Sequence, residues 1–485
     1  MRNLKISSIN PWKKSKAYTT RPQGKRGRVI FLFYPHKKNI LIRILIESDK
    51  KHKVENKKMR KNILRSMGII GTLSILAGCA NPSAAPITES KIQIPFNSSP
   101  NVSNESVCLS KGVDPLMIER MELSDIGDDQ KACISNASFA LLENVSQNEN
   151  ENILISPYSI NMALGMTELG ASGDTLKQME DTINGGLSRG EMQSIMYRLR
   201  QETESDDDIK WNTANSLWLK DDGQWVLKDK FLTDVVSFYD PDIYKAPFDN
   251  QTVKDINAWV SKETDKMIPE ILNYIDEDAA LYLINAVAFE AEWQEKYEDN
   301  DICENRTFSN ADGSTSEVTM LASSENRYFT LGKGEGFIKP YKGGRFSFVA
   351  ILPEEGMSTE EYISDIAASK EDFGKAVREA EYEYVIVNLP EFSMDYDVNL
   401  HEVYKNMGMD IPFDEERADF REMLEPASGE PYDVWIGRIL HKTHIEVDRK
   451  GTKAAAATVV EMDAECTSVS VAPEPKVIIL DRSYM

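Results

Sequence analysis

The sequence predicts an α+β fold, because helical patterns lie in the first part of the chain and strand patterns in the later part. Apolar residues recur at three- and four-residue spacing at 131–145 and 159–169, which is typical of helices with one buried face. Ser172 then offers a turn and the cap of a further helix. Runs of β-branched and aromatic residues follow at 281–289, 346–352, 384–389 and 435–447. This order, without an internal repeat, favours α+β over repeated βαβ units.

The composition indicates a folded, acidic protein. Hydrophobic residues make up 41% and charged residues 28% of the 485 residues, unlike a disordered chain. The formal net charge of −23 argues against nucleic acid or an anionic membrane surface as a partner, because both would repel the protein. Residues 1–65 hold 20 of the 56 basic and 3 of the 79 acidic side chains, which leaves 36 basic and 76 acidic to residues 66–485.

Residues 59–78 have the layout of a secretory signal peptide. Basic residues at its start are followed by the uncharged run 66–78, which is too short to span a bilayer. Leu76-Ala77-Gly78-Cys79 resembles the lipobox of bacterial lipoproteins, in which the signal is cut before a cysteine that carries lipid. A plain cleavable signal with an incidental cysteine is the alternative. We expect an extracytoplasmic protein that is secreted or lipid-anchored, with Cys79 as the lipidation site, and membrane contact only through that anchor.

The segments around this signal divide the rest of the chain. We attribute residues 1–58 to a mis-chosen start codon rather than to a functional basic arm. Residues 79–112 are rich in Pro, Ser and Asn and indicate a flexible tether to a folded domain at 113–485. With Cys79 assigned to lipid, four cysteines remain, which is too sparse for a disulfide framework in a chain this long.

Motifs of enzymes and metal sites are missing from the sequence. His441 and His444 are three residues apart in a strand pattern, which places them on opposite faces and prevents a shared metal. His401 remains as an isolated histidine, and Gly170-Ala171-Ser172-Gly173 lacks the frame of a nucleophile elbow. There is no His-Glu-x-x-His, phosphate loop or Cys-x-x-Cys. These absences argue against an enzyme and against a metal site.

The segment at 451–466 can form a strand with one uncharged face. At period two, one set of side chains is small or apolar: Thr452, Ala454, Ala456, Thr458, Val460 and Met462. The alternate set carries every charge up to residue 463: Lys453, Ala455, Ala457, Val459, Glu461 and Asp463. Such a strand can enter a packed sheet with one face and meet water with the other. Without that context, four consecutive alanines would indicate helix or linker.

This segment and the motifs before it resemble the serpin family of serine protease inhibitors. The resemblance covers about residues 131–482, and its motifs follow the family's order. They are Ser156-Pro-Tyr-Ser-Ile160, Asn215-Ser-Leu-Trp218, Asn285-Ala-Val-x-Phe289 with Trp293, Leu352-Pro353, Leu389-Pro-x-Phe392 and Met407-Gly-Met409.

The resemblance implies a serpin fold of three β-sheets and about nine helices, with an exposed reactive-centre loop after the hinge. It also implies a suicide-substrate mechanism. A serine protease attacks the loop and forms an acyl-enzyme, and the cleaved loop inserts into the main sheet before the ester is hydrolysed. The expected partner is therefore a serine protease held in a covalent acyl-enzyme complex, and the resemblance implies that no metal or cofactor is needed.

Roles for single residues follow from the resemblance. A polar cluster would lie under the opening of the main sheet (Ser156, Ser159, Asn285 and His441), with Trp293 at the top, where insertion begins. The hinge would comprise Arg449, Gly451, Thr452, Ala454, Ala455, Ala456 and Ala457. The family's usual loop length places the reactive bond between Glu465 and Cys466.

Two departures from the family pattern stand out. Arg449 occupies a position where the family commonly has Glu, so the usual salt bridge to a Lys cannot form. After Arg482 the family continues through two further strands, whereas this sequence ends at Met485. We therefore expect a domain that is truncated at its C-terminus.

Other functions remain open at this stage. A non-inhibitory serpin is one, and a surface binding lipoprotein or an acidic hydrolase is another. The alanines of the hinge, and the lack of Pro or charge on the inserting face, favour inhibition. The target also stays open: Glu465 suits a Glu-selective protease, Asp463 an Asp-selective one and Val469 an elastase-like one.

Overall fold

A seven-stranded sheet forms the centre of the molecule. The computed structural model describes residues 30–32, 105–118, 126–147, 151–202, 209–276, 279–369, 372–427, 434–452 and 475–485. The strand order of the large sheet is β14 (Phe392–Asn399), β16 (Arg438–Val447), β17 (Gly451–Thr452), β7 (Leu281–Glu292), β4 (Ile209–Lys220), β6 (Asp242–Ala246) and β2 (Val107–Cys108). Strand β7 is buried along nearly its whole length, because helices cover both faces of the sheet.

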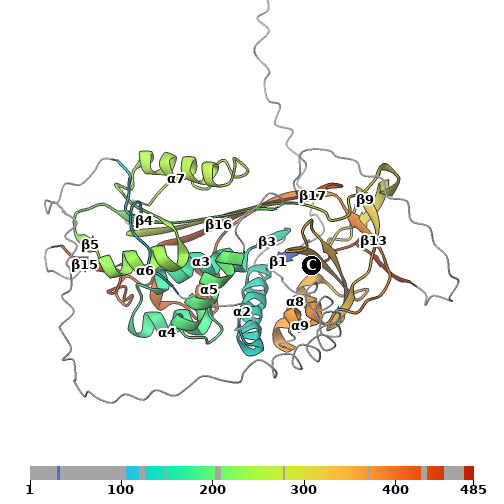
Figure 1. Cartoon of the computed structure of the whole chain (residues 1–485), viewed down its shortest axis with the longest axis horizontal. Helices are drawn as coiled ribbons and strands as arrows, with labels where there is room; N and C mark the ends of the chain where they lie inside the picture. The colour runs from blue at the N-terminus through green and yellow to red at the C-terminus, as the bar shows by residue number, and fades with distance from the viewer. Residues whose placement is uncertain are drawn as a thin grey trace, which may run out of the picture.

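Two smaller sheets lie at one end of this sheet. A four-stranded sheet has the order β18 (Lys476–Ile479), β13 (Val385–Pro390), β9 (Thr315–Glu325) and β8 (Ile302–Ser309). A three-stranded sheet contains β10 (Tyr328–Leu331), β11 (Gly334–Pro340) and β12 (Ser347–Pro353). Figure 1 shows β17 at the end of the large sheet that lies nearest β9 and β13.

Two further pairings have two strands each. Strand β1 (Ile30–Leu32) pairs in parallel with β3 (Ile153–Ile155), and β5 (Trp225–Leu227) pairs with β15 (Leu424–Pro426). The described residues therefore place part of segment 1–58 beside the domain. Part of the expected tether is also paired, since β2 lies antiparallel to β6.

Nine α-helices are present among the described residues, in agreement with the implied serpin fold. They are α2 (Asp128–Ser146), α3 (Pro157–Glu168), α4 (Gly173–Thr182), α5 (Arg189–Glu202), α6 (Asp229–Tyr239), α7 (Asn250–Glu263), α8 (Thr359–Ser369), α9 (Phe373–Arg378) and α10 (His401–Asn406). Helix α7 lies on one face of the large sheet, and α3 and α5 lie on the other (Figure 1). The α+β class predicted from the sequence is confirmed.

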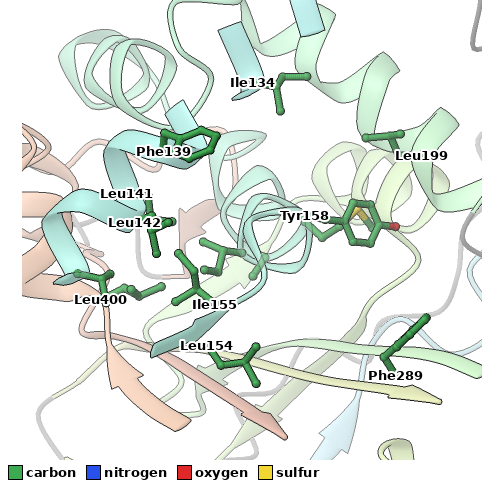
Figure 2. Close-up of a cluster of buried hydrophobic side chains, with 14 of the residues drawn as sticks. Ile134, Phe139, Leu141, Leu142, Leu154, Ile155, Tyr158, Leu199, Phe289 and Leu400 are labelled. Carbon is green, nitrogen blue, oxygen red and sulfur yellow. The ribbon is translucent and has the colours of Figure 1, made fainter. Parts of the chain in front are cut away.

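The main core lies between the large sheet and the helices beneath it. Figure 2 shows side chains from α2, β3, α3 and β7 converging there, among them Leu142, Ile155 and Phe289. Every residue of α3 is buried, so this helix packs directly against the sheet. Ser156 begins the helix, since its hydroxyl accepts the Ser159 backbone N–H at 3.3 Å and Pro157 supplies a fixed φ in the first turn.

The last residues of the chain pack against the three-stranded sheet. Met485 and Ile351 of β12 exchange two backbone hydrogen bonds, at 2.7 and 2.9 Å. The Tyr484 side chain is fully buried. The expectation that the domain is truncated after Arg482 stays a prediction from the sequence.

Candidate functional site

A row of three polar side chains crosses the middle of the large sheet. Asn285 on β7 is the register partner of Asn215 on β4 and of His441 on β16. Register partners on neighbouring strands point to the same face, so the three side chains meet above α3. All three are buried.

His441 is a neutral imidazole in this row. Its Nε2 accepts the backbone N–H of Ser156 at 3.1 Å, so the ring proton is on Nδ1 and is donated to Asn285 Oδ1 at 2.6 Å. Burial lowers the pKa of His441 to about 3, because the charged ring would lose its hydration. At neutral pH the cluster therefore holds together by hydrogen bonds without a charge.

The Asn285 amide connects the sheet to the helix below. Its Nδ2 donates to the Ser159 carbonyl at 2.9 Å, to the Ser159 hydroxyl, and to Asn215 Oδ1 at 2.6 Å. The four residues that the sequence assigned to a polar cluster are thus brought together. Asn215 was missed as a member, although it begins one of the motifs on which the resemblance rests.

The hinge residues Gly451 and Thr452 lie inside the sheet. They form β17, which pairs antiparallel with the end of β7 and with Val447 of β16. A Cβ on Gly451 would lie 2.1 Å from the Ala291 carbonyl oxygen, so only glycine fits this close approach. Thr452 is fully buried, and its hydroxyl lies 2.6 Å from that of Tyr341. The hinge therefore already occupies the first place in the gap between β7 and β16.

Trp293 holds the turn that leads into the hinge. Its indole Nε1–H donates to the Asp448 carbonyl at 2.9 Å, and its backbone N–H donates to the Lys450 carbonyl at 2.9 Å. The ring stacks on Tyr341 with a centroid distance of 4.6 Å and an angle of 7°. Since Tyr341 in turn contacts Thr452, one aromatic pair supports both sides of the hinge.

Arg449 faces two carboxylates instead of the Lys that the family commonly pairs with an acidic residue at this position. Its guanidinium lies 3.8 Å from Glu391, just before β14, and 3.6 Å from Asp299. The family's common pairing of an acidic hinge residue with a Lys is therefore replaced by a pair of the opposite polarity. The side chain is 45% exposed, so water screens the attraction.

The match to known families decides the assignment. The family model for "Serpin (serine protease inhibitor)" matches residues 133–485. The chain belongs to the serpin family.

Known serpins resemble the chain over most of their length. Serpin B6 of Pongo abelii is 27% identical, over 68% of this chain and 89% of its own. The thermophilic serpin tengpin in its native state is 34% identical, with a TM-score of 0.71 over 78% of this chain and 94% of that chain. Thyroxine-binding globulin in complex with thyroxine is 21% identical and shares the fold, with a TM-score of 0.62 over 74% of this chain and 94% of its own. Serpins are generally inhibitors of proteases rather than enzymes.

Several residues assigned from the sequence lie outside the described part of this serpin. They are the hinge alanines Ala454, Ala455, Ala456 and Ala457, the reactive bond Glu465–Cys466, and Cys79. His444 lies on the opposite face from His441, as expected, with its Nδ1 2.8 Å from Asp395. Within the described ranges no group of His, Cys, Asp and Glu could hold a metal, and no helix is long and apolar enough to cross a membrane.

Proposed function

We propose that this serpin is a suicide-substrate inhibitor of serine-type endopeptidases. The observation that carries the proposal is the position of β17, which lies antiparallel to both β7 and β16 at the top of the gap between them. Below it, β7 and β16 pair directly with each other in parallel over seven residue pairs. Parallel pairing is slightly less stable per residue than antiparallel pairing. A strand that continues β17 would replace one parallel ladder by two antiparallel ones, and this gain can drive insertion.

The residues after the hinge match the positions between β7 and β16 that they would occupy on insertion. In the register of β17, Thr458 would lie between Asn285 and His441, where its hydroxyl can both donate and accept. Lys453 would lie between Glu290 and Glu446, on the other face. Glu461 would lie beside Arg438. The inserting segment thus matches the strands in charge and in hydrogen bonding.

The proposed reaction leaves the protease bound as an ester. The protease serine Oγ attacks the carbonyl carbon of Glu465, the bond to the Cys466 nitrogen breaks, and the released amine takes up a proton. Insertion of the free strand then carries the esterified protease away from the hinge before water hydrolyses the ester. Hydrolysis and insertion compete, so any change that slows insertion converts the inhibitor into a substrate.

The test compares two substitutions one residue apart. Thr452 is buried beside Tyr341, and Thr452→Arg would place a guanidinium in that site at a cost of at least several kcal/mol. We expect the variant to be cleaved as fast as the parent but to form little detergent-resistant complex. Lys453→Arg keeps the charge between Glu290 and Glu446 and should preserve the complex. Equal complex yields from the parent and Thr452→Arg would contradict the insertion mechanism.

The same experiment separates the other candidate functions. A non-inhibitory serpin, a binding lipoprotein or a hydrolase would form no covalent complex with any protease. Mass spectrometry of the peptide released on cleavage would identify the scissile bond, and with it a Glu-selective, Asp-selective or elastase-like target. We also propose that the protein acts outside the cytoplasm, secreted or anchored through lipid on Cys79, which the lipobox-like residues before that cysteine support.

A further inference from the structure

A buried ion pair lies behind the aromatic residues that hold the hinge. Lys339, near the end of β11, is 3% exposed, and its Nζ lies 2.9 Å from Oε1 of Glu325 at the end of β9. Glu325 is also buried, and the same carboxylate oxygen accepts the Ser323 hydroxyl at 2.8 Å. The pair joins the three-stranded sheet to the four-stranded sheet.

The ammonium of Lys339 also contacts both aromatic rings beside the hinge. Its Nζ lies 4.5 Å from the ring centroid of Tyr297 and 5.5 Å from that of Trp293, within the range of a cation–π interaction. Burial raises the pKa of Tyr297, so its ring stays uncharged and its face attracts the cation.

Trp293 and Tyr297 also donate backbone hydrogen bonds to the segment that leads into the hinge. The Tyr297 N–H donates to the Arg449 carbonyl at 3.1 Å, and the Trp293 N–H donates to the Lys450 carbonyl at 2.9 Å. The contacts therefore run without a break from Glu325 through Lys339 and the two rings to residues 448–450. All three main sheets meet along this path.

We propose that Lys339, paired with Glu325, is a positioning residue that holds Trp293 and Tyr297 against the hinge and so favours loop insertion over release of the protease. The proposal deepens the proposed inhibitory function and rests on it for the part that concerns the protease. A cation this deep must stay paired, so the carboxylate fixes the ammonium, and the ammonium fixes the two rings. With the rings fixed, the turn before Gly451 keeps the direction from which the loop enters the sheet.

The test removes the cation without leaving a buried charge unpaired. In the double variant Lys339→Met, Glu325→Gln both side chains are neutral and nearly the same size, which avoids the misfolding that a lone buried carboxylate would cause in Lys339→Met alone. The first measurement needs no protease. We expect the amide protons of Trp293 and Tyr297 to exchange with solvent about tenfold faster, while that of Ser156, bonded to His441, is unchanged.

The second measurement uses the protease. We expect the loop to be attacked at the parent rate, but a several-fold smaller fraction of attacks to end as covalent complex. The matched control is Lys333→Met, Asp365→Asn, which removes a pair of the same charges whose side chains are 62% and 54% exposed, and it should behave as the parent.

The outcomes separate the two proposals. Unchanged amide exchange at Trp293 and Tyr297 would overturn the positioning role, and so would faster exchange with an unchanged fraction of complex. If the parent protein forms no complex with any protease, the inhibitory function fails, and amide exchange alone then decides whether Lys339 positions the hinge.

Discussion

Burial shifts the pKa values of two side chains near α3 in opposite directions. His441 has its pKa lowered to about 3, because burial disfavours the imidazolium. Glu168, at the end of α3, has its pKa raised to about 7, because burial disfavours the carboxylate more than the Asn184 hydrogen bond and Arg189 favour it. The first group must gain a proton when the protein unfolds in acid, and the second must lose one when it unfolds at neutral pH.

Glu168 should make the protein less stable as the pH rises. Its folded pKa of about 7 lies above its ordinary value of 4.5, so the stabilisation is complete below pH 4.5 and is lost as the pH rises to about 7. Glu168→Gln keeps an acceptor for Asn184 and should remove this loss, which amounts to about 3 kcal/mol. Urea unfolding at pH 5 and pH 8 measures the difference. The exposed Glu402→Gln should keep the parent's pH dependence, and an unchanged profile in Glu168→Gln would refute the assignment.

Single residues of the site differ in how far the sequence predicts them. The resemblance assigned His441 and Asn285 to one cluster, because family motifs preserve residue identity at such positions. Lys339 could not be assigned, since a lysine in a strand ordinarily lies in water and only the fold shows that Glu325 and two rings surround it. That Thr452 is already seated beside Tyr341 depends equally on contacts between distant segments.

At the scale of elements, the ion pair between Arg449 of the hinge and Glu391, just before β14, can be tested by swapping the two charges. Arg449→Glu and Glu391→Arg should each bring like charges together, whereas the double exchange restores an attraction. Because the pair is partly exposed, we expect a coupling of about 0.5 kcal/mol. A double-mutant cycle by urea unfolding at low salt measures it. Zero coupling would mean that the two charges do not interact.

The fit of β17 in the sheet can be tested with two glycines. Gly451→Ala would force a Cβ against the Ala291 carbonyl oxygen, and the hinge must shift away, at a cost of about 1–3 kcal/mol. Gly190→Ala, in the first turn of α5, has no atom within 4 Å of the added Cβ and should be neutral or stabilising by about 0.5–1 kcal/mol. The urea midpoint of Gly451→Ala should therefore fall, whereas that of Gly190→Ala should stay constant or rise. A shift of Gly451→Ala in the same direction as Gly190→Ala would contradict the tight fit.

Element types were predictable where the pattern was long, and boundaries were less so. The helix predicted at 131–145 is α2, and the strand predicted at 435–447 begins only at Arg438. Strands β2 and β17 have two residues each, which is too short for any periodic pattern, and they form because a sheet edge or a gap receives them. The sequence alone therefore could not show that the hinge occupies the sheet.

For the whole molecule, we expect cleavage of the loop to raise thermal stability. Insertion would replace the parallel ladder of β7 and β16 by two antiparallel ladders, a gain on the order of seven hydrogen bonds, or on the order of 10 °C in Tm. Calorimetry before and after cleavage by a protease that the serpin does not trap measures this. A Tm that falls or stays constant would show that the loop does not insert.

The proposed lipid anchor concerns the whole molecule. If Cys79 becomes the lipid-modified N-terminus, labelled fatty acid should enter the protein in a host with the lipoprotein pathway, and Cys79→Ala should abolish the label. Cys108→Ala serves as the control and should keep it. Label that persists in Cys79→Ala would show that the resemblance to a lipobox is incidental.

Residues 107–108 also bear on how the protein behaves at high concentration. Strand β2 covers β6, which would otherwise be the outer strand of the largest sheet, with unpaired N–H and C=O groups facing solvent. Exposed strands of this kind recruit other chains and start aggregates. The same two residues place charged and polar neighbours, Glu105 and Ser106, next to that edge. We therefore expect a segment whose composition indicates only a linker to limit self-association, in a protein whose proposed mechanism requires a sheet that accepts an additional strand.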